Sequence, residues 1–126
     1  MYFDRKDDII FVKWAKEVKI RDHFICYICD RRGVELNAHH KDSWDWCVER
    51  RYDLDNGATI CHYCHQQFHK IYGYGNNTEA QFIEFQESCK ILQKNIEKQF
   101  IASEIEKKLS TAEIIDKLKN DLDGYQ

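Results

Sequence analysis

The residues of this chain whose types could do chemistry gather in its middle, where two cysteines and two histidines share a nine-residue segment. Cys61 and Cys64 have the two-residue spacing that lets both sulfurs of a pair reach one zinc ion. His65 and His69 are four residues apart, so on a helix both imidazoles would lie on one face. Upstream stand a second cysteine pair and a histidine doublet: Cys26, Cys29, His39 and His40. The pattern predicts two metal sites, one built from sulfur and one from imidazole.

The sulfur site combines two C-x2-C pairs separated by 31 residues. Four thiolates fill a tetrahedral zinc and leave no open position, so this zinc is predicted to be structural. A redox-active dithiol is the alternative for either pair, and the presence of two pairs argues against it. Cys47 and Cys89 have no partner at such a spacing, and we interpret Cys89 as a small core residue.

The histidine doublet has a geometry of its own, because a strand points neighbouring side chains to opposite faces. One of His39 and His40 can therefore bind a metal with His65 and His69, while the other remains free for another role. The alternative is that these histidines are satisfied structural residues, and the adjoining zinc framework weighs against it. His23 and His62 receive no functional assignment.

Composition indicates one small intracellular domain. A chain of 126 residues buries only a modest core, so a structural metal would matter. The N-terminus lacks the apolar run of a signal peptide, and no stretch approaches the roughly 18 apolar residues of a membrane span. We therefore expect a cytoplasmic protein without a membrane partner, where reduced cysteine pairs bind metal.

Charge argues against a simple nucleic-acid interpretation, since the net charge is −3 and such domains are usually basic. The acidic excess lies in the tail, however. Residues 1–70 hold twelve basic and twelve acidic side chains, whereas residues 71–126 hold seven and ten. A scattered solvated surface is the alternative to a local basic site.

Periodicity predicts the elements that must position these residues. Residues 7–20 have an amphipathic helical pattern, and residues 23–29 and 35–40 have strand composition. A long loop with Trp44 and Trp46 closes at Asn56-Gly57, which is a strong turn signal. A helix over about 62–72 should stop at Gly73.

The C-terminal part is predicted to be helical. Thr78 and Gln81 form a capping box for a helix that runs to about residue 109, and Ser110 with Glu113 predicts a further short helix over 111–122. We expect a core over residues 1–78 and a helical extension over 79–126 within one domain. The extension should pack on the core, on a second copy or on a protein partner.

These motifs resemble the HNH endonucleases, whose fold is a ββα-metal finger. The resemblance covers about residues 14–85 and rests on Ala38-His39-His40, Asn56-Gly57 and Cys61-x-x-Cys64-His65-x-x-x-His69, with further likeness to phage and intron-borne homing members. It implies a small α+β fold: the finger with its four-cysteine zinc site, flanked by an N-terminal helix and a long C-terminal helix. A phage-encoded member would act in the host cell cytoplasm.

The resemblance also implies roles for individual residues. His40 is the expected general base, and Asn56 ties the loop that fixes it. A turn residue is the alternative interpretation of Asn56. His39 and His65, with His69, are expected to hold one divalent cation such as Mg²⁺, Mn²⁺ or Ni²⁺ beside the scissile phosphate of DNA.

Contacts with DNA are expected from the basic residues that flank this motif: Lys41, Arg50, Arg51 and Lys70. Trp44 and Trp46 could insert in a groove or cap a small core. Two other functions stay open at this point. One is a non-catalytic zinc-dependent DNA-binding module, and the other is a protein-interaction module that uses the acidic helical tail.

Overall fold

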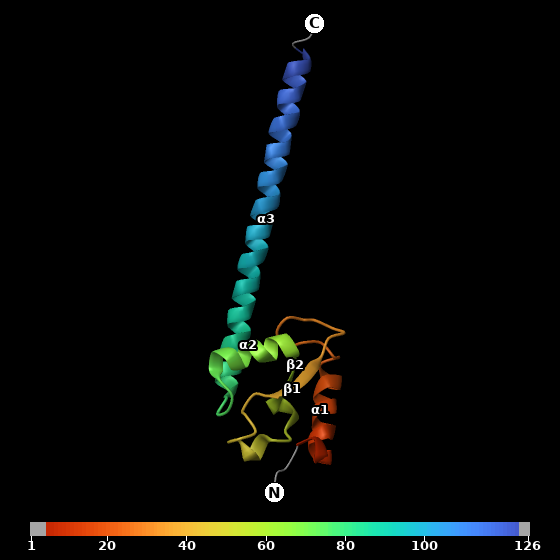
Figure 1. Cartoon of the computed structure of the whole chain (residues 1–126), viewed down its shortest axis with the longest axis vertical. Helices are drawn as coiled ribbons and strands as arrows, with labels where there is room; N and C mark the ends of the chain where they lie inside the picture. Colours follow the sequence, from red (N-terminus) through yellow and green to blue (C-terminus); the bar gives the residue numbers. More distant parts are fainter. Residues whose placement is uncertain (1–4, 124–126) are drawn as a thin grey trace. The chain divides into compact units, whose positions relative to one another are not determined.

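The computed structural model describes residues 5–123, which form a small α+β fold, as predicted (Figure 1). Residues 1–4 and 124–126, the outer ends of the two predicted domain ranges, lie outside it. Within the described range the regular elements are α1 (Ile9–Arg21), β1 (Leu36–His40), β2 (Gly57–Cys61), α2 (His62–Tyr72) and α3 (Glu79–Asp123). Short 3-10 helices occupy Arg5–Asp7, Val48–Arg50 and Leu54–Asn56. None of the described helices has the length and hydropathy of a membrane span.

The chain forms two compact units, Met1–Cys89 and Lys90–Gln126, and the boundary falls inside α3. The first unit contains the sheet, α1, α2 and the first turns of α3. The second unit is the remainder of α3, in which almost every side chain is exposed.

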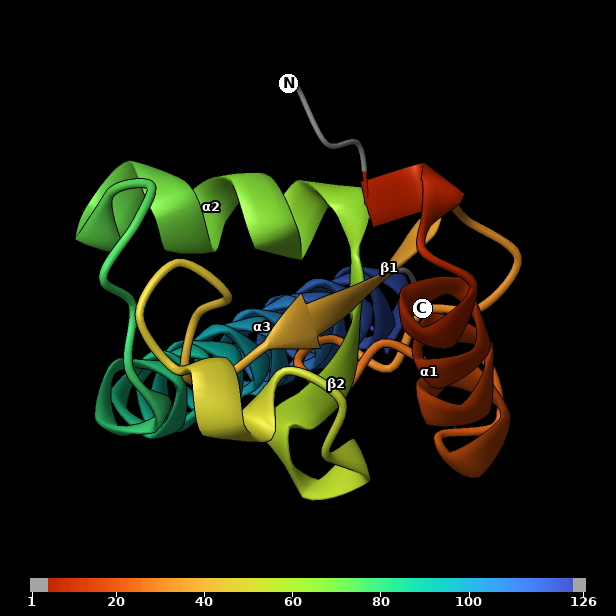
Figure 2. The same cartoon turned by 90° about the horizontal axis from the view of Figure 1, so that it is seen from below.

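The first unit is built on an antiparallel hairpin that pairs His40 with Gly57 and Leu36 with Cys61. Both α1 and α2 contact the two strands (Figure 2). The core contains Ile60 of β2, Phe68 of α2 and Phe82 of α3, none more than 1% exposed. Burying side chains of this size is worth about 1.5–3 kcal/mol each.

Helix α1 begins at Asp8, whose Oδ1 accepts hydrogen bonds from the N–H groups of Ile10 and Phe11. Its inner face places Trp14 and Val18 against Gly57 at the start of β2. A Cβ atom on Gly57 would lie 2.5 Å from Val18 Cγ2 and 2.8 Å from Trp14 Cζ2. Only glycine allows α1 to approach the hairpin this closely.

The turn signal at Asn56-Gly57 corresponds to the end of the 3-10 helix at Leu54–Asn56, directly before β2, and not to a glycine with positive φ. Gly57 has an extended backbone, with φ −103° and ψ 145°, and Asn56 ends the 3-10 helix at 54–56. Each of the two residues also has a role outside the turn. Asn56 supplies hydrogen bonds to the preceding loop, and Gly57 supplies space for α1.

The predicted strand at 23–29 is wrong, because the segment forms turns. His23 and Phe24 have φ of 56° and Asp30 has φ of 61°, so the chain turns repeatedly here. A strand would point residues 26 and 29 to opposite faces, because their separation is odd. The turns bring both sulfurs to one point instead, and Asp30 N–H donates to the Cys26 carbonyl within them.

The C-terminal helices differ from prediction at one position. Thr78 and Gln81 form the reciprocal capping box at the start of α3, as predicted. The expected second start at Ser110 is wrong, since α3 continues to Asp123. Thr111 Oγ1 donates to the carbonyl of Lys107, 2.9 Å away, so its hydroxyl is satisfied within the helix rather than acting as a cap.

Candidate metal centre and active site

The four cysteines of the two C-x2-C pairs converge although they come from three segments. Cys26 and Cys29 lie in the turns after α1, Cys61 ends β2 and Cys64 lies in the first turn of α2. Their sulfur atoms all lie within 4.8 Å of one another. The Sγ atoms of Cys29 and Cys61 are 3.7 Å apart. Bonds of about 2.3 Å in a tetrahedral zinc site require roughly 3.8 Å between sulfurs, so the cluster fits a metal of this kind.

Backbone groups and neighbouring thiols surround these sulfurs. The N–H of Cys61 points at the Cys26 sulfur at 3.3 Å, and the N–H of Cys64 points at the Cys61 sulfur at 3.4 Å. The thiol of Cys64 lowers the pKa of Cys26 to about 4, helped by the backbone N–H groups of Cys29, Cys61 and Ile28 and against the effect of burial. The same contact with Cys26 raises the pKa of Cys64. The chain therefore stabilises a thiolate here, which is the form that binds metal.

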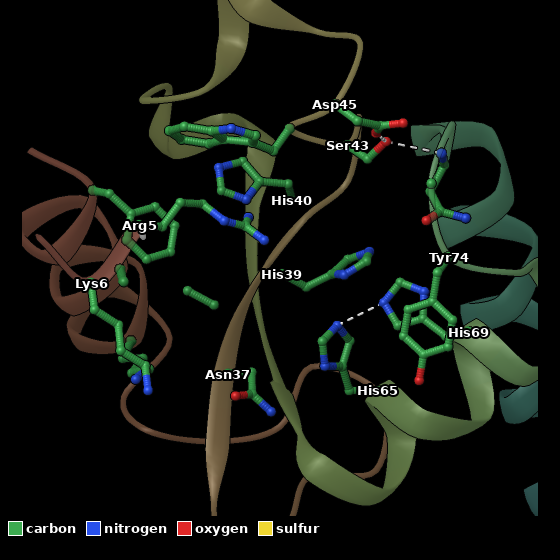
Figure 3. Close-up of a pocket in the computed structure, with 17 residues that line it drawn as sticks. Arg5, Lys6, Asn37, His39, His40, Ser43, Asp45, His65, His69 and Tyr74 are labelled. Carbon is green, nitrogen blue, oxygen red and sulfur yellow. Dashed lines mark hydrogen bonds between the residues drawn. The ribbon is translucent and has the colours of Figure 1, made fainter. Parts of the chain in front are cut away.

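Three histidines form the second cluster. His39 comes from β1 and is 4% exposed, and His65 and His69 come from one face of α2. Each offers a ring nitrogen within 4.8 Å of the others. The Nε2 atoms of His65 and His69 are 2.9 Å apart. Figure 3 shows the three side chains pointing toward one another.

The outer contacts of His69 fix how its ring is presented. Its Nδ1 lies 2.9 Å from the carbonyl oxygen of Gly73, which can only accept, so Nδ1 carries the proton. Nε2 then has its lone pair directed into the cluster, which is the arrangement found in metal-binding histidines. Tyr74 stacks on the same ring, with centroids 4.4 Å apart, and holds its plane.

His39 supplies the test of whether this cluster suits a metal. Its Nε2 is buried and has no hydrogen-bond partner among residues 5–123. A buried nitrogen of this kind is costly unless something binds its lone pair. Burial lowers the pKa of His39 to about 3, helped by the neighbouring His65 and His69. A neutral imidazole with an unused lone pair, beside two others, fits a divalent cation.

His40 points to the other side of β1 (Figure 3). Its ring stacks on Trp14, with centroids 4.0 Å apart and planes 15° from parallel, and the edge of Trp44 faces it at 5.6 Å. Its Nε2 donates to the carbonyl of Arg51, 2.8 Å away. The proton is therefore on Nε2, and Nδ1 carries the lone pair. Burial lowers the pKa of His40 to about 4, so the ring is neutral at pH 7.

Asn56 is fully buried and holds the loop that carries the Arg51 carbonyl. Its Nδ2 donates to the carbonyls of Asp42 and Arg50, at 2.9 and 3.1 Å, and its Oδ1 accepts from the N–H of Asp42 at 2.8 Å. Because Arg50 directly precedes Arg51, these bonds position the carbonyl that orients His40. The amide spans the loop between β1 and the 3-10 helix at 48–50.

The expected DNA-binding cations are mostly engaged inside the protein. Arg50 contacts Asp42 at 2.6 Å and Glu79 at 3.2 Å, and Lys41 lies 3.9 Å from Glu79. Arg51 donates from Nε to the Trp44 carbonyl and stacks over the Trp44 ring. Lys70 is exposed on α2. Of these four residues, Lys70 alone has no ion pair or hydrogen bond shown for its side chain in the described range.

A different set of basic side chains lines a cleft that also contains His40 and the three-histidine cluster. This cleft has a volume of about 760 Å³, and its walls include His39, His40, His65 and His69. The opposite wall comes from the N-terminal elements and carries Arg5, Lys6 and Lys19. Sequence analysis missed these three residues. The basic side of the amphipathic helix at 7–20 was visible, but its proximity to the histidines is a long-range contact that periodicity does not reveal.

Trp44 and Trp46 have separate positions. Trp44 lines the cleft and packs edge-on against His40, Phe11 and Tyr52. Trp46 donates from Nε1 to the Asn77 carbonyl at 2.7 Å and ties this loop to the start of α3. Both act as local packing residues, and Trp44 in addition forms part of the surface that a ligand in the cleft would meet.

Comparison with known proteins identifies the segment that contains these sites. Residues 26–70 match the family model described as HNH endonuclease. No curated protein and no solved structure matches the chain significantly. The matched segment begins at the first cysteine of the sulfur cluster and ends one residue after His69, so it contains both clusters, His40 and Asn56. Residues 26–70 of the chain are therefore similar to the HNH endonuclease family.

Proposed function

We propose that this protein is a metal-dependent DNA endonuclease that hydrolyses phosphodiester bonds at the cleft between α1 and the histidine cluster. The observation that carries the proposal is the difference between the environments of the two neighbouring histidines, His39 and His40. His39 has a buried, unpartnered Nε2 and lies beside two further imidazoles, whereas His40 presents a free Nδ1 in the same cleft. One strand thus supplies both a metal ligand and a base.

In this mechanism His40 Nδ1 takes a proton from a water molecule as the water oxygen bonds to phosphorus. The bond between phosphorus and the 3′-oxygen breaks, and the leaving oxygen takes up a proton from solvent. A positioned base of this kind typically contributes about 10²–10⁴-fold. The carbonyl of Arg51 holds the ring, and Asn56 holds the carbonyl of the preceding residue, Arg50.

His39, His65 and His69 would hold one divalent cation. When bound, the cation neutralises charge on the scissile phosphate and stabilises the departing oxygen. His69 is kept in the correct tautomer by Gly73, and the buried position of His39 limits water access to its nitrogen. Zinc in the four-cysteine cluster would be structural, since the four sulfurs leave no open position.

For DNA contact we propose Arg5 and Lys19 ahead of the four cations expected from sequence. Both line the cleft wall opposite the histidines, whereas Arg50 and Lys41 are compensated by acidic side chains. Such contacts would neutralise phosphates and position the duplex without reading its sequence. A homing or phage-associated setting and a cytoplasmic location stay predictions from the resemblance and the composition.

Plasmid cleavage measured across a metal titration tests the proposal. His40→Ala should keep the fold, the bound zinc and most of the DNA affinity, while turnover drops by about two or more orders of magnitude. His65→Ala should in addition raise the concentration of added Mg²⁺, Mn²⁺ or Ni²⁺ needed for cleavage. His62→Ala is the matched control, because His62 is exposed and outside both clusters, and it should cleave normally.

Near-wild-type cleavage by a folded, zinc-loaded His40→Ala protein would contradict the mechanism. A folded wild-type protein that binds DNA without cleaving it in any of the three metals would support the non-catalytic DNA-binding module instead. A protein that binds neither DNA nor RNA would favour an interaction module.

The cleft wall is tested by the salt dependence of DNA binding. Each lost phosphate contact should reduce the slope of log K against log salt by about 0.9. Arg5→Ala with Lys19→Ala should therefore lower the slope by about two. Lys13→Ala is the control, since Lys13 lies on α1 with a largely exposed side chain and does not line the cleft. An unchanged slope in the double variant would exclude this wall as the phosphate site.

A further inference from the structure

The second unit exposes an unusual amount of apolar surface. Eleven leucine, isoleucine and phenylalanine side chains lie between residues 91 and 122. The least exposed of them is Ile115, at 48%, and Leu122 reaches 71%. On the same helix, Phe82 and Phe85 are 1% and 4% exposed. Contiguous exposed apolar surface of this extent marks an interaction site.

Six of these side chains share one side of the helix. At about 100° per residue, the positions 92, 96, 100, 114, 118 and 122 fall within a sector of about 120°. Polar residues also fall in this sector. Gln93 and Asp121 lie within the two apolar groups, and the residues between the groups are Ser103, Glu104, Lys107, Ser110 and Thr111. Ile105 and Leu109 lie on the opposite side of the helix and belong to another surface. We call the six-residue sector the apolar face.

The apolar face is symmetric about Lys107. Leu92 and Leu122 each lie 15 residues from it, Ile96 and Leu118 lie 11 residues from it, and Phe100 and Ile114 lie seven residues from it. A two-fold axis at Lys107 therefore brings each apolar residue of one copy level with an apolar residue of an antiparallel partner. Such self-complementarity is what a two-fold interface between identical chains requires.

Charge selects the antiparallel direction. Residues 90–100 hold three lysines and one glutamate, whereas residues 113–123 hold two lysines and four acidic residues. Parallel pairing would place like charge beside like charge at both ends. Antiparallel pairing places the basic start of one helix beside the acidic end of the other. At the axis, Glu104 lies 3.5 Å from Lys107 Nζ in the same chain and compensates its charge.

Other occupants fit less well. Residues 90–123 hold seven lysines and seven acidic residues, so the unit has no net charge to attract a phosphate backbone or an anionic membrane. A different protein would have no need of the symmetry about Lys107. We infer that residues 90–123 of α3 form an antiparallel homodimer in which the apolar face of one copy packs on that of the other.

Light scattering and sedimentation equilibrium on the full chain test this inference, and neither depends on nuclease activity. The wild-type protein should have the mass of a dimer. Ile96→Asp should weaken dimerisation by at least 100-fold, because it places a charge in the apolar face. Ile105→Asp is the matched control, since Ile105 has a similar exposure of 52% against 56% but lies on the opposite side. It should leave the mass unchanged.

A monomeric wild type at about 100 μM would overturn the inference, as would an Ile105→Asp protein that dissociates as readily as Ile96→Asp. Far-UV circular dichroism and zinc content show whether either variant has lost its fold. A wild-type dimer that both variants preserve would also overturn it, because the interface would then lie elsewhere.

Charge reversal tests the direction of pairing. K90E/K94E/K98E should dissociate the antiparallel dimer, because both ends of the helix then carry negative charge. D116K/D121K/D123K should do the same with positive charge. The protein with all six substitutions should dimerise again, since its ends are oppositely charged once more. Dimerisation of the first variant with wild-type affinity would show that the charged ends do not set the direction of pairing, and it would overturn the antiparallel arrangement.

Discussion

The two units of this chain each contain a segment of α3. The apolar residues have similar spacing in both segments, but they are buried in the first unit and exposed in the second. Phe82 and Phe85 at the start of α3 are almost fully buried, whereas Ile96 and Leu118 further along are more than half exposed. The spacing of three and four residues is present in both segments. Periodicity therefore identifies an apolar face but does not say what covers it. The first unit covers its face with a hairpin and two clusters of metal-binding side chains.

Removing the sulfur cluster should affect the two units most differently. Cys61→Ser should unfold the first unit, because zinc in such sites contributes on the order of 10–16 kcal/mol, comparable to the whole stability of a small domain. The helix of the second unit should keep its slow amide exchange if it is paired. Elemental analysis measures the bound zinc, and hydrogen exchange measures the amide protection of each unit.

Cys47→Ser is the control for that experiment, since Cys47 is equally buried but lies outside the cluster. It should retain bound zinc and a cooperative melt. Protein purified under reducing conditions that holds no tightly bound zinc would refute the structural role of the metal.

The contrast between the units should also appear in the free energy of unfolding. Phe82→Ala removes a side chain that contacts Phe68 in the core and should cost about 3–5 kcal/mol. Ile105→Ala removes exposed surface and should change stability by less than about 0.5 kcal/mol. Urea unfolding of the two variants measures the difference. Equal costs would show that Ile105 is covered in solution.

A smaller effect is expected where α1 meets the hairpin. Gly57→Ala introduces a Cβ atom within 2.8 Å of Trp14 and Val18, so one of the elements must shift, at a cost of about 1–3 kcal/mol. Because Trp14 stacks on His40, the variant should also lose cleavage activity. Gly33→Ala gives a comparison for the added methyl group, since nothing lies within 4 Å of that position, although its φ of 67° adds local strain. Full activity in Gly57→Ala would separate helix packing from the site.

The smallest expected change is in the pH dependence of cleavage. Burial lowers the pKa of His40 to about 4, and a base with a lowered pKa stays neutral as the pH falls. Its contribution is present above that value and is lost only as the pH drops through it. The rate at pH 5.5 should thus remain within about twofold of the rate at pH 7.5, whereas a base with an ordinary pKa of about 6.5 would lose roughly tenfold. A tenfold fall in metal-saturated, folded protein would contradict this environment for His40.

Local patterns in the sequence predicted local structure well. The capping box of Thr78 and Gln81 and the stop at Gly73 follow from short spacings, and the convergence of the four cysteines follows from the need of one metal for four ligands. The structure confirms all three. The predicted strand at 23–29 failed because β-forming composition competed with the need to bring two sulfurs together. Metal geometry decided the outcome there.

Contacts between residues that are far apart in the chain could not be predicted from the sequence. The stack of Trp14 on His40 joins residues 26 positions apart, and Asn56 bonds a residue 14 positions before it. The predicted helix break at Ser110 failed for a simpler reason. Hydroxyl residues can lie inside a helix as well as cap one, and the neighbouring Thr111 bonds back to Lys107 within α3. No spacing rule distinguishes the two choices when the flanking residues all favour helix.

Cys61 does more than contribute a sulfur, because its side chain also accepts the N–H of Cys64 and so caps α2. That helix carries His65 and His69. The sulfur cluster thus fixes the start of α2, the helix that carries both imidazoles. We therefore expect a fixed order of loading, in which zinc enters first and the exchangeable cation second. A mild chelator should strip the second ion reversibly from a folded protein, whereas loss of the first should abolish the affinity for both.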